Sequence, residues 1–467
     1  MQLAIGPQLI VIEEVTGGGK TEAALTLAAR LLVAREADGI YLALPTMATA
    51  DAMHSRVERV YQRFFADGTS ASLVLAHSMA AFSLGLERTN TTDAGYGLKE
   101  HDSASSHCTA WLADSRKKAL LAHVGVGTID QALLGILPAR HQSLRLWGLL
   151  GKVLIADEVH ACDAYVMDLL KTLLKFHAAF GGSAILLSAT LPQSQRAGLV
   201  AAFMEGAGFA APAVTEMAYP LVTHISTQEM SEVPIAARPV SQRTVRVESL
   251  PDVGTALERL RAALHRGLCA CWVRNTIADA LEAYTLWVKE IGAENVLLYH
   301  ARFALTDRLH IGAAVLKRFG KDSKAAARNG RLVIATQVVE QSLDVDFDYM
   351  VTDLAPIDLV IQRAGRLKRH ARDVQGNPIQ GGDMRGEAVL GVLMPGADRQ
   401  ASGGWYKAFL PRAAYVYSHH GQLWLTARWL QTHGAFAMPD HAREMIEFVY
   451  GDDAGERIPE CSPRLWG

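Results

Sequence analysis

A glycine-rich run near the start of the sequence has the residue types that bind phosphate: Gly17, Gly18, Gly19, Lys20 and Thr21. It follows a predicted strand and opens a predicted helix at residues 20–33. In that setting the glycines let backbone N–H groups approach an anion, and the helix N-terminus favours negative charge. Lys20 could reach the β and γ phosphates of a nucleotide, and the Thr21 hydroxyl could ligate Mg²⁺. The run predicts a phosphate loop; the alternative is a glycine turn that only ends the strand.

One residue departs from the usual pattern of such a loop. Five positions before Gly19, where glycine or alanine is usual, the chain has Glu14. A carboxylate close to a triphosphate would repel it. We therefore expect weakened nucleotide binding unless the Glu14 side chain points outward.

Two adjacent carboxylates, Asp157 and Glu158, follow an apolar run at residues 153–156. In a parallel sheet this strand end opens onto the same crevice as the phosphate loop. There Asp157 could hold Mg²⁺ through water, while Glu158 could orient and deprotonate an attacking water. The pair indicates phosphoryl transfer, although an acidic pair after a strand, taken alone, is usually a helix N-cap.

A second polar segment, Ser188, Ala189 and Thr190, also follows an apolar run. We expect its hydroxyls to form hydrogen bonds with the loop at residues 157–160 and to transmit the presence of the γ-phosphate to another domain. Taken alone, the segment could equally be an ordinary turn.

Three arginines, at positions 363, 366 and 369, recur every third residue late in the sequence. The spacing predicts that they lie along one helix face, where they cannot all be buried without anionic partners. A guanidinium suits a phosphate in transfer because it is planar and always charged. The alternative is a solvated basic face.

Short apolar strands alternate with helical segments in both halves of the sequence, which predicts α/β domains with parallel sheets covered on both faces. The predicted strands of the first half are residues 8–12, 40–44, 72–75, 153–156 and 184–187. Those of the second half are residues 244–248, 269–273, 295–299, 332–335, 349–352 and 388–393.

The periodicity is lost between about residues 211 and 243, where four prolines occur, so the domain boundary is expected there. We predict four parts along the chain: a first domain at residues 1–215, a linker at 216–243, a second domain at 244–395 and a mostly helical C-terminal segment at 396–467. The C-terminal segment is expected to be a small, partial accessory domain.

The composition is that of an ordinary globular protein. With 467 residues, 50% of them apolar and 20% charged, the chain is neither disordered nor a coiled coil. Its net charge of −2 excludes a global basic field for nucleic acid, so any phosphate-binding surface must be local. Five cysteines without metal or disulfide spacing predict free thiols. No apolar run is long enough for a membrane helix, and the N-terminus lacks the basic region of a signal peptide, so we expect a cytoplasmic protein.

Taken in this order on two α/β domains, these elements resemble a superfamily 2 helicase of the DExH kind. Further segments resemble the helicase of type I CRISPR interference, in particular its subtype I-E form, at residues 43–50, 126–131, 185–192, 299–303, 338–344, 353–358 and 362–367. The resemblance covers residues 8–395 and implies two tandem RecA-like P-loop NTPase domains with ATP and Mg²⁺ as cofactors. It also implies recruitment by Cascade, the surveillance complex with its guide RNA, and 3′-to-5′ translocation on single-stranded DNA.

The resemblance further implies roles for individual residues. ATP binding would fall to Thr16, Gly17, Gly18, Gly19, Lys20, Thr21, Asp344 and Arg363. Catalysis would fall to Lys20, Asp157 and Glu158, with Arg366 and Arg369 as arginine fingers, and Mg²⁺ to Thr21 and Asp157. Coupling between the domains would fall to His160, Ser188, Thr190 and Gln362. DNA backbone contacts would fall to Thr46, Thr128, Asn275, Thr276 and Thr336. Arg363 is expected to bridge to the acidic loop around Glu158.

One departure from the family concerns nuclease activity. The family commonly has an HD-type nuclease domain before the helicase, whereas here the phosphate loop begins about 16 residues from Met1. We therefore expect nuclease activity to be absent from this chain. Three explanations stay open: a fragment, a split-gene helicase subunit with a separate HD nuclease acting in trans, or a degraded copy. The single His-Asp pair before residue 430, His101 and Asp102, lies in a polar stretch and is expected to have no such role.

Two other hypotheses stay open. The chain could be an ATPase-deficient scaffold that binds DNA or Cascade, or a DExH helicase directed to RNA. Binding of a fluorescent ATP analogue separates the first from a motor, and stimulation by DNA and RNA homopolymers at one salt concentration separates the second.

Overall fold

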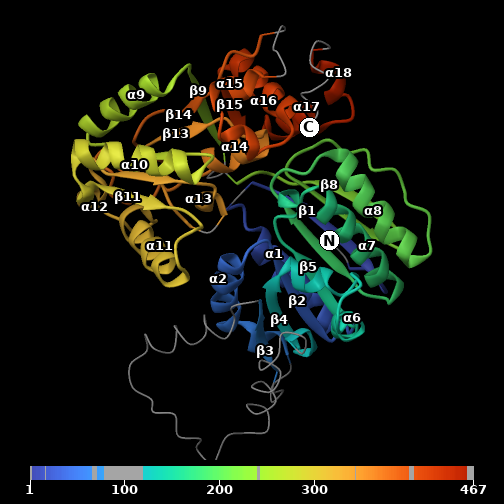
Figure 1. Ribbon diagram of the computed structural model, residues 1–467. Helices are drawn as coiled ribbons and strands as arrows, with labels where there is room; N and C mark the ends of the chain where they lie inside the picture. Colours follow the sequence, from blue (N-terminus) through green and yellow to red (C-terminus); the bar gives the residue numbers. More distant parts are fainter. Residues whose placement is uncertain are drawn as a thin grey trace, which may run out of the picture. The chain divides into compact units, whose positions relative to one another are not determined.

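The computed structural model describes residues 3–15, 17–65, 71–77, 119–238, 242–341, 343–398 and 404–459. These form two compact units, Met1–Arg238 and Pro239–Gly467, each built around its own sheet (Figure 1). The predicted α/β class is confirmed for both units.

The sheet of the first unit runs in the order β3-β4-β2-β5-β6-β1-β7-β8. From β3 to β1 all neighbours are parallel, and β7 and β8 extend the sheet in antiparallel fashion beyond β1. The strands are β1 (Gln8–Glu13), β2 (Gly39–Leu44), β3 (Leu73–Ala76), β4 (Val124–Thr128), β5 (Lys152–Ala156), β6 (Ala184–Ser188), β7 (Leu221–Ser226) and β8 (Met230–Pro234).

Helices cover both faces of this sheet, which explains why its strands are apolar along their whole length. Leu9 and Val11 of β1 belong to one buried cluster together with residues of α7 and α8. Ile10 and Ile12, on the opposite face, belong to another cluster with residues of α1 and α2. The helices are α1 (Lys20–Val33), α2 (Met47–Glu58), α5 (Ile129–Leu133), α6 (Gln142–Leu149), α7 (Ala164–Ala179) and α8 (Gln193–Ala207).

The sheet of the second unit runs in the order β11-β12-β10-β13-β14-β9-β15, with only β15 antiparallel to its neighbour among the described strands. The strands are β9 (Arg243–Leu250), β10 (Ala270–Val273), β11 (Val296–Tyr299), β12 (Leu332–Ala335), β13 (Tyr349–Asp353), β14 (Ala388–Leu393) and β15 (Ala435–Met438).

The longer helices of the second unit are α9 (Val253–His265), α10 (Ile277–Ile291), α11 (Leu305–Phe319), α14 (Ile357–Ala364), α16 (His420–His433) and α17 (Ala442–Tyr450). Shorter ones are α12 (Ala325–Arg328), α13 (Val338–Gln341), α15 (Trp405–Phe409) and α18 (Ala454–Arg457).

Two predicted boundaries need correction. The expected linker at residues 216–243 contains part of the first sheet, because β7 and β8 lie within it and extend that sheet beyond β1. The expected separate C-terminal segment belongs to the second unit, because β15 pairs with β9 and completes the second sheet. The division between the units falls at Arg238 and Pro239.

Three cysteines within the described ranges, Cys162, Cys269 and Cys271, are free, and the last two are fully buried. His101 and Asp102 lie outside the described residues. In the described part of the chain, no helix combines the length and the apolar character needed to cross a membrane.

Candidate active site

The phosphate loop joins the end of β1 to the start of α1, as the sequence predicts. Gly17 and Gly19 have φ of 91° and 96°, a left-handed conformation that residues with a side chain rarely adopt. Gly19 caps α1 without a side-chain hydrogen bond. The first N–H groups of α1 therefore have no side-chain cap, which is the arrangement that binds an anion.

Lys20 is buried, and its charge has no carboxylate partner among the described residues. Its Nζ donates to the carbonyl oxygens of Glu14, at 2.7 Å, and Val15, at 3.4 Å, while only 8% of the residue is exposed. A buried ammonium held only by carbonyl dipoles is stabilised further by an anion, and a phosphate would supply one. Thr21 follows in the first turn of α1, and Thr16 lies outside the described residues.

Glu14 does not point outward. A Cβ placed on Gly18 would lie 2.1 Å from Cγ of Glu14, so this side chain packs directly over the glycine. Its Oε1 accepts the N–H of Val15 at 2.9 Å. Burial raises the pKa of Glu14, against the lowering effects of that hydrogen bond and of Lys20 and Arg238. Gly18 is thus required here for a reason specific to this chain: a side chain at that position would displace Glu14.

The acid pair follows β5, and β6 alone separates β5 from β1 in the sheet. The pKa of Asp157 is raised to about 7, chiefly by burial and then by the neighbouring Glu158, while Lys20 acts to lower it. The ammonium of the phosphate loop and the acid pair therefore interact electrostatically. The N–H of Glu158 donates to Oδ1 of Asp157 at 3.0 Å, and Glu158 itself has a left-handed φ of 53°.

The expected hydrogen bond between the acidic loop and the segment at residues 188–190 is confirmed for Ser188, the last residue of β6. Its Oγ lies 3.1 Å from Nδ1 of His160, and the N–H of Ala189 donates to the same nitrogen at 3.3 Å. Thr190 differs from the expectation, because it donates its backbone N–H to Ser188 Oγ at 3.2 Å and its own Oγ1 is buried without a partner among the described residues. His160, two residues after Glu158, thus connects the loop that follows β5 to the end of β6.

Two threonines expected at DNA stand at the carboxyl ends of neighbouring strands. Thr46 follows β2 and caps α2 through a capping box with Thr49. Thr128 is the last residue of β4 and precedes α5. Register pairs Leu44 with Thr128, so both threonines lie at the same edge of the first sheet.

In the second unit, Thr276 and Thr336 also follow strands, β10 and β12. Thr276 caps α10, and Thr336 is 4% exposed. Asn275 differs from the expected DNA contact. Its side-chain amide donates to the carbonyl of Leu354 at 2.7 Å and to the hydroxyl of Tyr406 at 3.0 Å, and the residue is 3% exposed. Its hydrogen bonds hold the second unit together.

Arg363 has other partners than the predicted Glu158 loop. It is fully buried, and its Nε donates to Glu340 Oε1 at 2.7 Å. Its remaining nitrogens donate to Thr352 Oγ1 at 2.6 Å, to the Asp353 carbonyl at 3.0 Å and to the Tyr417 hydroxyl at 3.1 Å. Burial would lower the pKa of Arg363, but Glu340, Tyr417 and Asp353 together outweigh burial and the net shift is upward. Arg363 therefore anchors α14 to α13 and β13.

The prediction that the three arginines share one helix face is wrong. α14 ends at Ala364, and the chain then forms a β-bridge in which Phe347 pairs with Leu367. Arg366 and Arg369 therefore lie beyond the helix, and Lys368 has a left-handed φ of 46°. Gln362, expected to couple the domains, lies within α14 and is 7% exposed.

Arg366 and Arg369 are held in different ways. Arg366 is 5% exposed and donates to the carbonyl oxygen of Glu340. Arg369 pairs with Asp344 at 2.8 Å, and His370 lies 2.9 Å from the same carboxylate. Burial would raise the pKa of Asp344, but His370 and Arg369 bring it below its usual value. Asp344 thus holds Arg369 within its own unit.

Sequence reasoning missed three residues of these two sites. Glu340 is the buried partner of Arg363, and Asp353 pairs with Arg274 at 3.0 Å. Arg238 places its guanidinium against Gly19 of the phosphate loop. Glu340 and Asp353 lie in the family-like segments at residues 338–344 and 353–358, but their partners are far away along the chain and no local pattern reveals them. Arg238 lies in no such segment.

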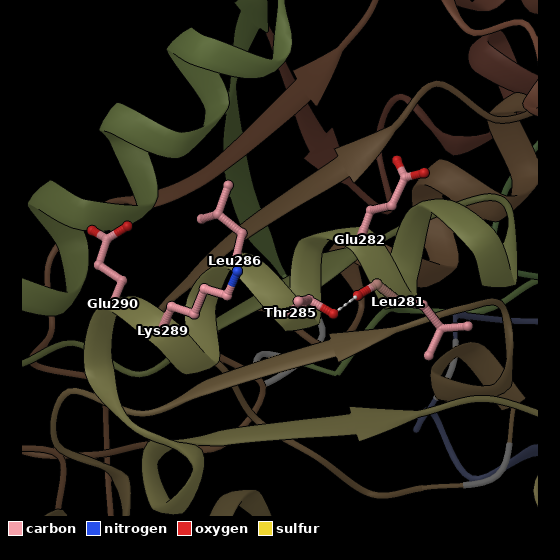
Figure 2. A pocket seen from close by; sticks show the side chains of 6 residues that line it. All are labelled: Leu281, Glu282, Thr285, Leu286, Lys289 and Glu290. Carbon is pink, nitrogen blue, oxygen red and sulfur yellow. Dashed lines mark hydrogen bonds between the residues drawn. The ribbon is translucent and has the colours of Figure 1, made fainter.

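A shallow pocket on α10 lies away from these motifs within the second unit. It is lined by Leu281, Glu282, Thr285, Leu286, Lys289 and Glu290, all from the outer side of this one helix (Figure 2). None of its residues belongs to the motifs, so we do not assign the active site to it.

The donors around the phosphate loop suit Mg²⁺. The described residues contain no cluster of three or more histidine, cysteine or carboxylate side chains that could hold a metal by themselves. Mg²⁺ is usually held by one or two carboxylates together with substrate phosphates, with oxygen as its ligand. The Thr21 hydroxyl and the Asp157 carboxylate provide such oxygens.

Comparison with known proteins places the chain among CRISPR-associated proteins. Residues 266–372 match the family model of the CRISPR-associated nuclease/helicase Cas3 C-terminal region. The chain is 36% identical over 475 residues to the CRISPR-associated endonuclease/helicase Cas3 of Escherichia coli K12, covering 98% of this chain and 50% of that protein. It therefore spans about half the length of the curated relatives it matches.

Solved structures give the same result. The crystal structure of T. fusca Cas3 with AMPPNP superposes with a TM-score of 0.80 at 34% identity, over 96% of this chain and 50% of that one. A chain from a pre-nicking CRISPR RNA-guided surveillance complex superposes with a TM-score of 0.72 at 33% identity, over 96% of this chain and 49% of the other. The two units are thus the two RecA-like domains seen in Cas3 structures, and this chain belongs to the CRISPR-associated Cas3 family, of which it represents the helicase region.

Proposed function

We propose that this chain is an ATP-driven motor that translocates 3′ to 5′ on single-stranded DNA during type I CRISPR interference. One observation carries the proposal: a buried lysine without a carboxylate partner and a carboxyl with a raised pKa influence one another at the same edge of the first sheet. Both groups would gain from a magnesium-bound triphosphate.

Each residue of the first unit would have a distinct task. The N–H groups of the phosphate loop and the Lys20 ammonium would hold the β and γ phosphates, and Thr21 and Asp157 would hold Mg²⁺. When bound, Mg²⁺ would neutralise charge that develops on the phosphates. Glu158 would orient the attacking water and accept its proton, and His160 would pass the state of the site to Ser188.

The second unit would supply the arginine fingers. Arg366 and Arg369 would stabilise the negative charge of the phosphate in transfer, as planar guanidiniums do. Closure of the two units around ATP and reopening after hydrolysis would move the DNA strand. Thr46, Thr128, Thr276 and Thr336 would contact its phosphates as uncharged donors, which agrees with the net charge of −2.

The partners we propose follow from the relatives. Similarity to a chain of an RNA-guided surveillance complex supports recruitment to Cascade with its guide RNA. The relatives are named nuclease/helicase or endonuclease/helicase, and we propose that the motor activity of this helicase region works together with a nuclease.

ATP turnover with and without single-stranded DNA tests the proposal. Wild type should release phosphate faster when DNA is present, and Lys20→Ala should lose that activity. Lys171→Ala, which removes a lysine from α7, is the matched control and should keep it. Glu158→Gln should bind ATP but not hydrolyse it. DNA-independent turnover, or an active Lys20→Ala variant, would refute the motor.

The position of Glu14 supports a second candidate, an ATPase-deficient scaffold that binds DNA or Cascade. Its buried carboxyl packs over Gly18, inside the loop that would hold the triphosphate. Equilibrium binding of a fluorescent ATP analogue with Mg²⁺ separates the two candidates. Saturable binding favours the motor, and its absence favours the scaffold.

A further inference from the structure

Arg238 lies against the phosphate loop. A Cβ placed on Gly19 would be 2.9 Å from Nη2 of Arg238, 3.3 Å from its Cζ and 3.4 Å from its Nη1. Cζ and both terminal nitrogens of the guanidinium thus lie close to Gly19, the residue that caps α1. Glycine at position 19 is what allows this close approach.

This arrangement brings two cationic side chains together at one helix N-terminus. The N-terminus of the 14-residue helix α1 carries partial positive charge, and the Lys20 ammonium lies beside it. Arg238 adds a full charge and forms no ion pair with a carboxylate of the described ranges. Glu14 interacts electrostatically with both cations, and its Oε1 accepts the N–H of Val15 rather than a hydrogen bond from either cation.

We infer that Arg238 is a further phosphate-binding residue, which contacts the terminal phosphates of a nucleoside triphosphate held by the loop at residues 17–21. The inference rests on the proposed function. An anion on the loop would lie next to two cationic side chains and a helix N-terminus, and a guanidinium binds phosphate through paired hydrogen bonds.

The position of Arg238 in the chain would also link phosphate binding to the connection between the two units. Arg238 is the last residue of the first unit, and Pro239 is the first residue of the second. A phosphate bound to Arg238 would fix the end of the first unit from which the chain continues into the second. Nucleotide binding would thereby order the connection between the units directly. This effect would come in addition to that of the arginine fingers.

Equilibrium binding of fluorescent ATP and AMP analogues to the full chain, with Mg²⁺ at one salt concentration, tests the inference. The variants are Arg238→Ala, Arg238→Lys and the control Arg30→Ala, which removes an exposed arginine from the last turn of α1. Arg238→Ala should raise the Kd for the ATP analogue on the order of tenfold, as loss of a charged hydrogen bond does, and change that for AMP little. Arg238→Lys should restore part of the affinity, and Arg30→Ala should bind within twofold of wild type.

The outcomes separate this inference from the proposed function. If wild type binds ATP and Arg238→Ala binds it equally well, Arg238 is not a phosphate ligand, although the motor stands. If Arg238→Ala binds more tightly, the guanidinium obstructs the site and the inference is wrong. If wild type shows no saturable binding, both fall. Unfolding midpoints without nucleotide should be equal for Arg238→Ala and wild type, since Arg238 is exposed.

Discussion

The phosphate loop of the first unit and the arginine segment of the second are both rich in buried charge, but only the second balances it internally. Lys20 is held by carbonyl oxygens, and Asp157 has a raised pKa because of burial and Glu158. In the second unit Arg363 pairs with Glu340, and Asp346 pairs with Arg372 and Arg385. Unbalanced buried charge costs stability unless a ligand completes it, whereas balanced charge fixes a scaffold.

Arg366 is the residue that tests this contrast most severely, because it sits in the balanced unit but donates to a carbonyl oxygen. We predict that Arg366→Ala lowers DNA-stimulated ATP hydrolysis on the order of 10³-fold or more, as loss of an arginine finger does. Phosphate release at saturating ATP and DNA measures the effect. A folded Arg366→Ala variant with near wild-type turnover would place Arg366 with the scaffold.

Arg363 should behave in the opposite way. Arg363→Met leaves Glu340 buried and uncompensated, so we expect the free energy of unfolding to fall by about 3–5 kcal/mol. Urea denaturation followed by tryptophan fluorescence reports on the second unit through Trp272, Trp287, Trp424 and Trp429. The double variant Arg363→Met with Glu340→Leu should recover part of the loss. A single variant as stable as wild type would show that the pair is not a scaffold.

The buried carboxyl of Asp157 should make the stability of the first unit depend on pH. Its pKa is raised to about 7 in the folded protein and is close to 4 in an unfolded chain. The folded state holds the proton more tightly, so the contribution of Asp157 to stability is present below about pH 4 and is lost as pH rises to about 7.

Asp157→Asn should remove this dependence. In EDTA at pH 8 we expect the variant to be more stable than wild type by roughly 1–3 kcal/mol, with little difference at pH 4. Urea denaturation followed by circular dichroism measures both. Adding Mg²⁺ with ATP should stabilise wild type more than the variant. Equal stability of the two proteins at pH 8 would show that Asp157 is not an unbalanced charge.

The smallest expected effect on stability is that of an exposed ion pair. Arg246 and Glu387 lie 2.9 Å apart with side chains 48% and 58% exposed. A double-mutant cycle with alanine at both positions should give a coupling of about 0.2–1 kcal/mol, because water screens the pair. A coupling energy as large as that of Arg363 and Glu340 would mean that burial does not determine how much an ion pair contributes to stability.

The sequence predicts the strands of both units well wherever they are apolar and continuous, and α1 has the predicted bounds. It misses β4, because Gly125 and Gly127 interrupt the apolar pattern; Gly127 is needed there since a Cβ would lie 2.2 Å from the carbonyl of Ala76. It also misses β7 and β8, because Pro220 and Pro234 suggest a loop. These prolines are tolerated next to and at the end of strands near the sheet edge.

The candidate site is predicted in its local motifs but not in its long-range partners. The phosphate loop and the acid pair each follow a strand and Ser188 ends one, which the local sequence pattern reveals. The partner of Arg363 depends on how α14 packs against α13, and the end of α14 depends on the bridge between Phe347 and Leu367. No spacing rule contains this information, because these contacts arise only when the sheet has formed.

The pairing of β15 with β9 also bears on how the chain behaves when shortened. β9 hydrogen-bonds to β14 on one side and to β15 on the other. A chain cut before Ala435 would leave the N–H and C=O groups of β9 unpaired along an open strand, and such strands recruit neighbours from other molecules. Self-association, rather than simple loss of a domain, is the expected result of removing the last 33 residues.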